Sequence, residues 1–205
     1  MSSSVDLAEG AAALGVVLDD GQVMRLQRFA ELLVKWNASY NLISRNDHPR
    51  VLSRHLLDSL SLAPLLVMPR VLDVGTGAGL PGVPLAIARP EGEFVLMDRS
   101  EKRLRFVRHV IGELGITNAQ VCEADVAAYP AKQHFDTVVS RAVAAPAALW
   151  PMIRGLLTDG GVALFQCGDP ANLESPALAR IDSKALCIPG LDTPHYVMRL
   201  EAVAA

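Results

Sequence analysis

Residues 71–90 read VLDVGTGAGLPGVPLAIARP, which is a short apolar run, a glycine-rich turn and then a second apolar stretch. This order predicts a buried strand, a tight turn and a helix. Small residues in such a turn let backbone amides approach a ligand, and the start of the helix offers it a partial positive charge. The stretch therefore predicts an α/β fold with a binding site at the end of this strand.

Two overlapping motifs in this turn predict different ligands. Counted from Gly77, the letters match G-x-G-x-x-G, which is typical of nicotinamide or flavin enzymes; counted from Asp73, they match D-x-G-x-G-x-G, which is typical of methyltransferases that bind S-adenosylmethionine. The first motif would extend the strand through Gly75, a poor strand residue. Pro81 also lacks an N–H where a pyrophosphate would need donors. We favour the second motif, in which Asp73 orients the turn, and we keep a purely structural turn as an alternative.

An acidic residue, Asp98, ends the next predicted strand, roughly twenty residues after the turn. Its carboxylate can accept hydrogen bonds from both hydroxyls of a ribose, which NAD and S-adenosylmethionine share. We therefore expect the methionine part of S-adenosylmethionine against the turn from Gly75 through Gly77 to Gly79, with the ribose on Asp98.

Composition indicates a single globular unit. The 205 residues are 51% hydrophobic and 20% charged, with a formal net charge of −3, which is not the overall electrostatics of a nucleic-acid binder. No signal-like segment or stretch of roughly 18 apolar residues occurs, so we expect a cytoplasmic protein that does not enter a membrane. Cys122, Cys167 and Cys187 show no C-x-x-C spacing, and we interpret them as reduced core thiols with no metal site.

The chain changes character near residue 67. The first part shows helical spacing, with one helix starting at Asp19, Asp20 and Gly21 and a second following a turn at Asn46 and Asp47. The second helix is expected to bury Val51, Leu52, Leu56, Leu60 and Ala63. Short apolar runs then alternate with helical stretches, which is typical of a parallel sheet, and two final strands, 185–188 and 196–200, predict an antiparallel edge. We expect a helical extension over residues 1–66 and a Rossmann-like domain over residues 67–205.

Four motifs in order resemble the GidB/RsmG family: WN with NL at 36–42, RHLLDSL at 54–60, DVGTGAGLPG at 73–82 and SRA at 140–142. Proteins of that family are bacterial methyltransferases that use S-adenosylmethionine to methylate guanine N7 in 16S ribosomal RNA. The resemblance implies a Rossmann-like class I methyltransferase fold with a mostly parallel seven-stranded sheet. It implies 16S rRNA or the small ribosomal subunit as the partner.

The resemblance also implies roles for individual residues. Gly75 and Leu80 match cofactor-binding positions, Val126 and Ala127 match the pair that flanks the adenine, and Arg141 matches the arginine at the mouth shared by cofactor and substrate. Asp125, directly before the adenine pair, is counted with the cofactor-binding positions. Three positions depart from the family pattern, because Asp125, Cys167 and Pro194 stand where many relatives carry basic residues. These departures predict weaker RNA binding, RNA recognition by other residues, or lost activity.

The expected chemistry needs few reactive groups. Guanine N7 has a free lone pair, so positioning can supply most of the catalysis. The fourth strand ends in SRAV, which is neither the [DN]-P-P-Y of amino methylation nor the Pro-Cys of pyrimidine methylation. Arg141 is our candidate catalytic residue, holding guanine O6 or a phosphate; the alternative is an ion pair with a loop carboxylate.

Several charged residues allow two interpretations. His55 and Asp58 share a helix face, which is also typical of an acid/base pair or of metal ligands. Because the sequence offers no third ligand, we interpret them as a buried hydrogen-bonded pair that fastens the extension. Basic side chains on two segments form a local RNA-binding patch or a solvated helix face: Arg45, Arg50, Arg54, Lys102, Arg103, Arg105 and Arg108. The alternatives to an RNA methyltransferase are a nicotinamide-dependent oxidoreductase and a nucleotide-binding regulatory protein. We expect a monomer.

Overall fold

The computed structural model describes residues 6–130 and 134–203, and its centre is a seven-stranded sheet with the order β3-β2-β1-β4-β5-β7-β6. The strands are β1 (Arg70–Val74), β2 (Glu93–Asp98), β3 (Ala119–Glu123), β4 (Phe135–Arg141), β5 (Leu157–Cys167), β6 (Ala179–Leu186) and β7 (His195–Ala202). The first five pair in parallel, and β7 runs antiparallel between β5 and β6. The predicted mostly parallel sheet with an antiparallel C-terminal edge is confirmed.

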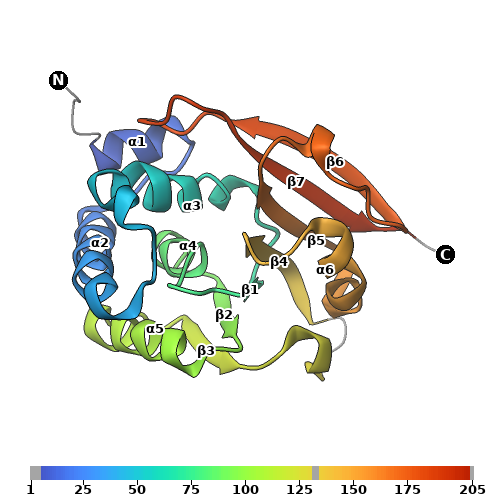
Figure 1. Cartoon of the computed structure of the whole chain (residues 1–205), viewed down its shortest axis with the longest axis horizontal. Coiled ribbons are helices and arrows are strands. Elements are labelled where there is room, and N and C mark those ends of the chain that lie inside the picture. Colours follow the sequence, from blue (N-terminus) through green and yellow to red (C-terminus); the bar gives the residue numbers. More distant parts are fainter. Residues whose placement is uncertain (1–5, 131–133, 204–205) are drawn as a thin grey trace.

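Helices cover both faces of this sheet (Figure 1). They are α1 (Leu7–Ala13), α2 (Asp20–Tyr40), α3 (Asp58–Leu60), α4 (Gly82–Ala88), α5 (Glu101–Leu114) and α6 (Pro146–Ile153). The first five lie on one face and α6 lies on the other. This three-layer arrangement is the Rossmann-like class I fold that the motif predicted. In the part of the chain that the structure describes, no helix has the length and apolar character needed to cross a membrane.

The alternation of side chains along each strand builds one core on each face. In β1, Val71 packs with the α1–α5 layer, whereas Leu72 and Val74 pack with the α6 layer. The strand is thus buried on both sides, which explains why its sequence is a continuous apolar run and not an alternating one. Asp73 is the one charged residue in β1 that is fully buried, and its carboxyl group accepts hydrogen bonds from the turn that follows.

The helical extension packs into the same core as the sheet. Helix α2 begins with a capping box, in which the Asp19 side chain accepts from the Gln22 amide and the Gln22 side chain accepts from the Asp19 amide. Its buried face carries Leu26 and Phe29, and Phe29 stacks on Phe106 of α5. The predicted start of this helix at Asp19 is therefore confirmed, with a physical cause.

The second predicted helix is less regular than expected. Residues Arg45–Arg50 form a 3-10 helix, Leu52–Leu57 form a π-helical segment, and only then does α3 begin, so Asn46 and Asp47 lie inside the helical stretch and not in a turn before it. Leu56, Leu60 and Ala63 are buried as predicted, but Val51 and Leu52 are only half-buried. The wider π turn shifts which side chains face the core, because it changes the number of residues per turn.

Two other expectations need correction, and one helix was not expected. Helix α1 was not among the expected elements, although Asp6 followed three residues later by Glu9 is a signal for a helix start; the Asp6 side chain accepts from the Glu9 amide and caps the helix. Strand β6 runs from Ala179 and ends at Leu186, because its pairing with β7 sets its length, whereas a strand over 185–188 was expected. The cysteines are free; Cys122 and Cys167 are half-buried and pack against the core, whereas Cys187 is exposed and does not belong to it.

Candidate active site

The glycine-rich turn follows β1 directly and is held by Asp73. The Asp73 Oδ2 atom accepts hydrogen bonds from the Thr76 hydroxyl at 2.7 Å and from the Gly82 amide at 2.8 Å. These two bonds tie the middle of the turn and the start of α4 to the end of the strand. The structure thus confirms that Asp73 orients the turn and that β1 ends before Gly75.

Burial sets the protonation of this carboxyl group. Asp73 is fully buried, and desolvation raises its pKa from 3.8 to about 6, against the hydrogen bonds from Thr76 and Gly82, which lower it. The other oxygen, Oδ1, is buried without a hydrogen-bond partner among the described residues. Asp73 is therefore a structural carboxyl group that the fold keeps away from water.

Gly77 is the point of the turn that is open to a ligand. Its φ of +56° lies in the left-handed region, and a Cβ built on it meets nothing closer than the Gly75 carbonyl oxygen at 3.8 Å. At Gly79, in contrast, a Cβ would lie 2.6 Å from a Val83 methyl group. Gly79 is thus required by packing against α4, whereas the space beside Gly77 belongs to a cavity.

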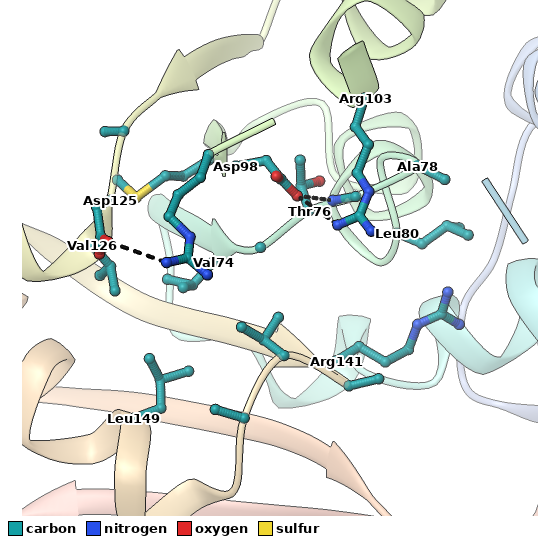
Figure 2. A pocket seen from close by; sticks show the side chains of 18 of the residues that line it. Val74, Thr76, Ala78, Leu80, Asp98, Arg103, Asp125, Val126, Arg141 and Leu149 are labelled. Carbon is teal, nitrogen blue, oxygen red and sulfur yellow. Dashed lines mark hydrogen bonds and ion pairs between the residues drawn. The ribbon is translucent and has the colours of Figure 1, made fainter. Parts of the chain in front are cut away.

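That cavity has a volume of about 530 Å³ and lies at the carboxyl ends of β1, β2 and β4 (Figure 2). Eight of the nine predicted cofactor-binding residues line it: Gly75, Gly77, Leu80, Asp98, Asp125, Val126, Ala127 and Arg141. Gly79 does not line it, for the packing reason given above. The structure therefore brings these eight residues together, although they come from four separate segments.

Asp98 forms the polar centre of the cavity wall. One carboxylate oxygen accepts from the Gly77 amide at 2.9 Å and the other accepts from the Ser100 amide at 2.8 Å, while the Arg103 guanidinium lies 3.7 Å away. A carboxylate has about four acceptor positions, so each oxygen can accept a further hydrogen bond. The side chain is buried, yet it lines the cavity, which suits it to bind neutral hydroxyl groups.

Asp125 lies at the far end of the same cavity. Its side chain accepts from the Ala127 amide at 3.0 Å and so caps the short 3-10 helix Val126–Ala128. Its other oxygen lies 3.4 Å from Arg99 in an exposed ion pair. Asp125 thus shapes the segment that carries Val126 and Ala127, a contribution that an arginine at this position would not make.

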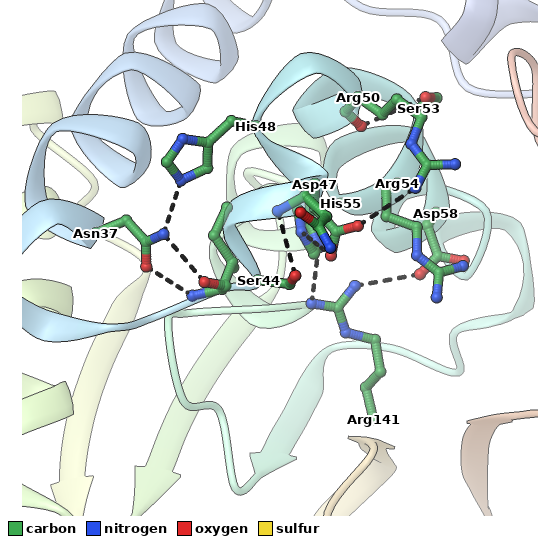
Figure 3. A network of polar contacts seen from close by, with 12 residues as sticks. Asn37, Ser44, Asp47, His48, Arg50, Ser53, Arg54, His55, Asp58 and Arg141 are labelled. Atoms are coloured by element: carbon green, nitrogen blue, oxygen red, sulfur yellow. Dashed lines mark hydrogen bonds and ion pairs between the residues drawn. The ribbon is translucent and has the colours of Figure 1, made fainter.

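A second cavity of about 540 Å³ adjoins the first, and Arg141 and Ala142 line both. Arg141 extends from the end of β4 toward the helical extension (Figure 3). Its Nη1 atom lies 3.2 Å from Asp58 Oδ2 and its Nη2 atom lies 3.4 Å from His55 Nδ1. The ion pair considered for Arg141 is therefore present, with a carboxylate from a helix and not from a loop.

His55 and Asp58 do not form the hydrogen-bonded pair that was expected, because both side chains bind Arg141. They still fasten the extension to the sheet, since Asp58 also binds His195 of β7 at 2.7 Å. The ring of His195 lies 2.6 Å from Arg54. His195 was missed at the sequence level because it stands 137 residues from Asp58 and has no local motif around it.

His55 is held in its neutral form. The pKa of His55 is lowered from 6.5 to about 4, first by burial and then by the nearby charge of Arg141, while Asp47 and Asp58 act in the opposite direction. A neutral imidazole can accept from Arg141, whereas a charged one cannot. The protonation state of His55 is therefore the one that the contact with Arg141 needs.

Most of the basic residues that were considered as an RNA-binding patch are paired. Arg105 and Arg108 both bind Glu101 on their own helix, and Arg50 lies 3.6 Å from Asp47. Lys102 lies over the ring of Tyr40 at 5.2 Å. On α5 these contacts match the solvated helix face, which was the alternative interpretation. Among the described residues, no three His, Cys, Asp or Glu side chains gather as a metal site.

Comparisons with known proteins show the family of the chain. A family model described as rRNA small subunit methyltransferase G matches residues 22–181. Ribosomal RNA small subunit methyltransferase G of Chromobacterium violaceum is 39% identical over 202 residues, covering 96% of this chain and 97% of that protein. The protein of the same name from Shewanella amazonensis is 40% identical over 198 residues, covering 95% of this chain and 96% of that protein.

Solved structures show the same fold at low sequence identity. A SAM-dependent methyltransferase from Aquifex aeolicus matches with a TM-score of 0.58 at 16% identity, covering 78% of this chain and 96% of that one. A SAM-dependent O-methyltransferase from Thermotoga maritima matches with a TM-score of 0.56 at 17% identity, covering 72% of this chain and 66% of that one. The solved structures support the fold alone. The sequence relatives are similar over nearly the full length of the chain, so they also support an assignment to a family. The chain belongs to the rRNA small subunit methyltransferase G family, as its motifs predicted.

Proposed function

We propose that this protein transfers a methyl group from S-adenosylmethionine to N7 of a guanine in 16S rRNA of the small ribosomal subunit. The observation that carries the proposal is the position of Arg141, which lines both the cavity beside the glycine-rich turn and the cavity next to it. A cofactor in the first and a base in the second would meet at this residue. The family and the names of the relatives support an RNA substrate.

The first cavity suits S-adenosylmethionine. When bound, this cofactor supplies a methyl group activated by a sulfonium. The open space at Gly77 fits the methionine part, and Gly75 and Leu80 line the same cavity. Asp98 retains acceptor positions for the two ribose hydroxyls. We assign the adenine to the side of Val126 and Ala127, with Asp125 holding that segment in place.

The acceptor atom needs positioning more than activation. Guanine N7 has a free lone pair and no proton to lose, so no general base is required for the attack. Among the residues of the SRAV segment at the end of β4, only Arg141 is charged. We assign to Arg141 the task of holding the guanine at O6, which leaves N7 free to face the methyl group. The base would enter through the second cavity.

RNA binding must rely on few positive charges. The net charge is −3, and Asp125, Cys167 and Pro194 are not basic. Loss of phosphate contacts weakens sequence-independent affinity, because each contact contributes through counterion release. We therefore propose that an assembled small subunit, which offers a preformed shape, is a better substrate than naked RNA. We also expect the protein to act in the cytoplasm as a monomer.

Methyl transfer to bacterial small subunits that lack their own modification tests the proposal. Tritium from labelled S-adenosylmethionine should enter 16S rRNA at one guanine, and borohydride reduction followed by aniline cleavage should locate it at N7. Naked 16S rRNA is assayed in parallel. No incorporation into either substrate would refute the proposed reaction.

Cofactor binding is measured separately by calorimetry. S-adenosylhomocysteine should bind, whereas NAD and AMP should bind far more weakly. Binding of NAD would instead favour an oxidoreductase. Binding of S-adenosylhomocysteine without methyl transfer would favour a regulatory protein that has lost catalysis.

A further inference from the structure

Arg141 is one member of a buried polar chain that crosses three parts of the fold. Its ion pair with Asp58 is shielded, since the Asp58 side chain is 4% exposed and that of Arg141 is 18% exposed. The Gln166 amide of β5 donates to the Asp58 carbonyl oxygen at 2.7 Å, which fixes the backbone that carries the carboxylate. The end of β4, the start of α3 and β5 are thereby joined at the wall between the two cavities.

The hydrogen-bond donors in this chain can be assigned from the chemistry of arginine, which has donors only. Arg54 Nη1 lies 2.6 Å from His195 Nε2, so that nitrogen must accept and the ring proton must be on Nδ1. His195 Nδ1 then donates to Asp58 Oδ1 at 2.7 Å, while Arg141 donates to Asp58 Oδ2. Each carboxylate oxygen thus receives one donor, and His195 has a single allowed tautomer.

The same reasoning applies on the other side of Arg141. Its Nη2 atom faces His55 Nδ1 at 3.4 Å, so this nitrogen must accept and the proton of His55 must be on Nε2. Nε2 lies 3.5 Å from Asp47 Oδ2 and makes no hydrogen bond among the described residues. The two histidines therefore have opposite tautomers, and between them Asp58 and His55 hold two nitrogens of the guanidinium.

We propose that Asp58 and His195 are positioning residues, which hold Arg141 as a charge-compensated hydrogen-bond donor directed at the oxygen of a base and not at a phosphate. This inference rests on the proposed function. A guanidinium whose charge is matched by a buried carboxylate attracts an anion weakly, but its remaining N–H groups keep their direction. Such a group suits guanine O6, which is neutral.

A double-mutant cycle tests whether Asp58 acts through Arg141. Single-turnover methyl transfer to small subunits is measured for Asp58→Asn, Arg141→Ala and the double variant. Each single variant should slow transfer by about tenfold, and the double variant should be no slower than Arg141→Ala, because residues that act as one unit are not additive. If the two effects multiplied, so that the double variant lost about a hundredfold in transfer rate, the proposal would be overturned.

Asp136→Asn is the matched control, because Asp136 pairs with Arg70 at the opposite end of the same strand, β4. Like Asp58→Asn, this variant removes one negative charge from an aspartate–arginine ion pair, but it does so far from both cavities. Its transfer rate should equal that of the parent. If Asp58→Asn does not fold, His195→Ala takes its place in the cycle, since the His195 side chain is more exposed, at 17%.

Salt dependence separates a base contact from a phosphate contact. Arg141→Ala should leave the slope of log affinity for the subunit against log salt unchanged. Asp58→Asn should steepen it by up to about one unit, and only while Arg141 is present, because the freed charge can then reach a phosphate. A slope that falls by about one unit in Arg141→Ala would show a phosphate contact and refute the assignment.

Nitrogen NMR tests the arrangement without any RNA. In the parent protein with labelled histidine, His195 should carry its proton on Nδ1 and His55 on Nε2. Asp58→Asn combined with Arg54→Ala should abolish the preference of His195, because both partners that set its tautomer are then changed, whereas Asp136→Asn should not. The opposite tautomer in the parent would overturn the positioning network, while absence of methyl transfer with both tautomers as assigned would count against the proposed function alone.

Discussion

The Gly77 amide donates a 2.9 Å hydrogen bond to the Asp98 carboxylate, which joins the turn after β1 to the end of β2. The two residues are 21 positions apart in sequence and form adjacent parts of one cavity wall. The bond points the Gly77 backbone at the carboxylate and leaves its Cα facing the cavity. Any side chain at position 77 would therefore occupy space that we assign to the cofactor.

Gly77→Val should abolish binding of S-adenosylhomocysteine and leave the protein folded. A valine with positive φ is strained by about 1–2 kcal/mol, and its methyl groups would fill the cavity. Gly115→Val is a matched control, since Gly115 has φ +61° and equally open surroundings at the end of α5. Both variants should lose similar stability in urea unfolding, and only Gly77→Val should lose binding by calorimetry. Unchanged affinity would favour the dinucleotide motif.

Asp73→Asn should change how stability depends on pH. The Asp73 pKa is raised to about 6, above its ordinary 3.8, so its contribution is fully present below about pH 4 and is lost as pH rises through 6. Asparagine keeps one oxygen for Thr76 and Gly82 and cannot ionise. Between pH 4 and pH 7.5, the free energy of unfolding of the variant should gain about 3 kcal/mol relative to the parent. Parallel curves from urea unfolding at the two pH values would contradict this.

His55 should titrate well below its ordinary range, with a pKa of about 4 by NMR. Because the folded pKa is depressed, the unfolded chain binds the proton more readily, and this group costs stability as pH falls from 6.5 toward 4. Arg141→Ala should raise the pKa of His55, since the neighbouring positive charge lowers it, and Asp47→Asn should lower it further. Shifts of the same sign in both variants would show that these charges do not control the ring.

Asp125→Arg should strengthen binding to RNA if this position faces a phosphate. One added contact should steepen the salt slope by roughly one unit. Asp125→Asn is the control, because it removes the charge but can still cap the Ala127 amide. Equal slopes for the two variants would show that residue 125 does not face RNA. The affinity for S-adenosylhomocysteine shows whether losing the cap disturbs the cofactor cavity.

Arg141→Ala should slow methyl transfer at least about tenfold, which is about 1.4 kcal/mol of transition-state stabilisation. The affinity for S-adenosylhomocysteine should change less than the rate, because the assigned role concerns the acceptor. Arg70→Ala is the matched control, since Arg70 also pairs with an aspartate but at the other end of the sheet. Full activity of Arg141→Ala in single-turnover assays would remove Arg141 from the mechanism.

The features that the sequence determined are those that depend on neighbours in the chain. The apolar run of β1, the glycines at 75 and 77 and the acidic residue Asp98 predicted the strand, the turn and the cavity, because strand period and turn conformation are local properties. The cap at Asp19 is equally local, since its partner is three residues away. The parallel sheet followed from the alternation of strands and helices.

Other features were decided by packing between distant segments. Arg141 and Asp58 are 83 residues apart, and Asp58 and His195 are 137 apart, so no spacing in the sequence indicated that they share one network. The same is true of the length of β6, which β7 sets, and of Gly79, whose surroundings are Val83 and Val107 and not the cavity. The sequence determined which residues carry the chemistry, because motifs and periodicity are local. The tertiary structure decided which of them meet, because a buried charge is stable only where the fold supplies its partners.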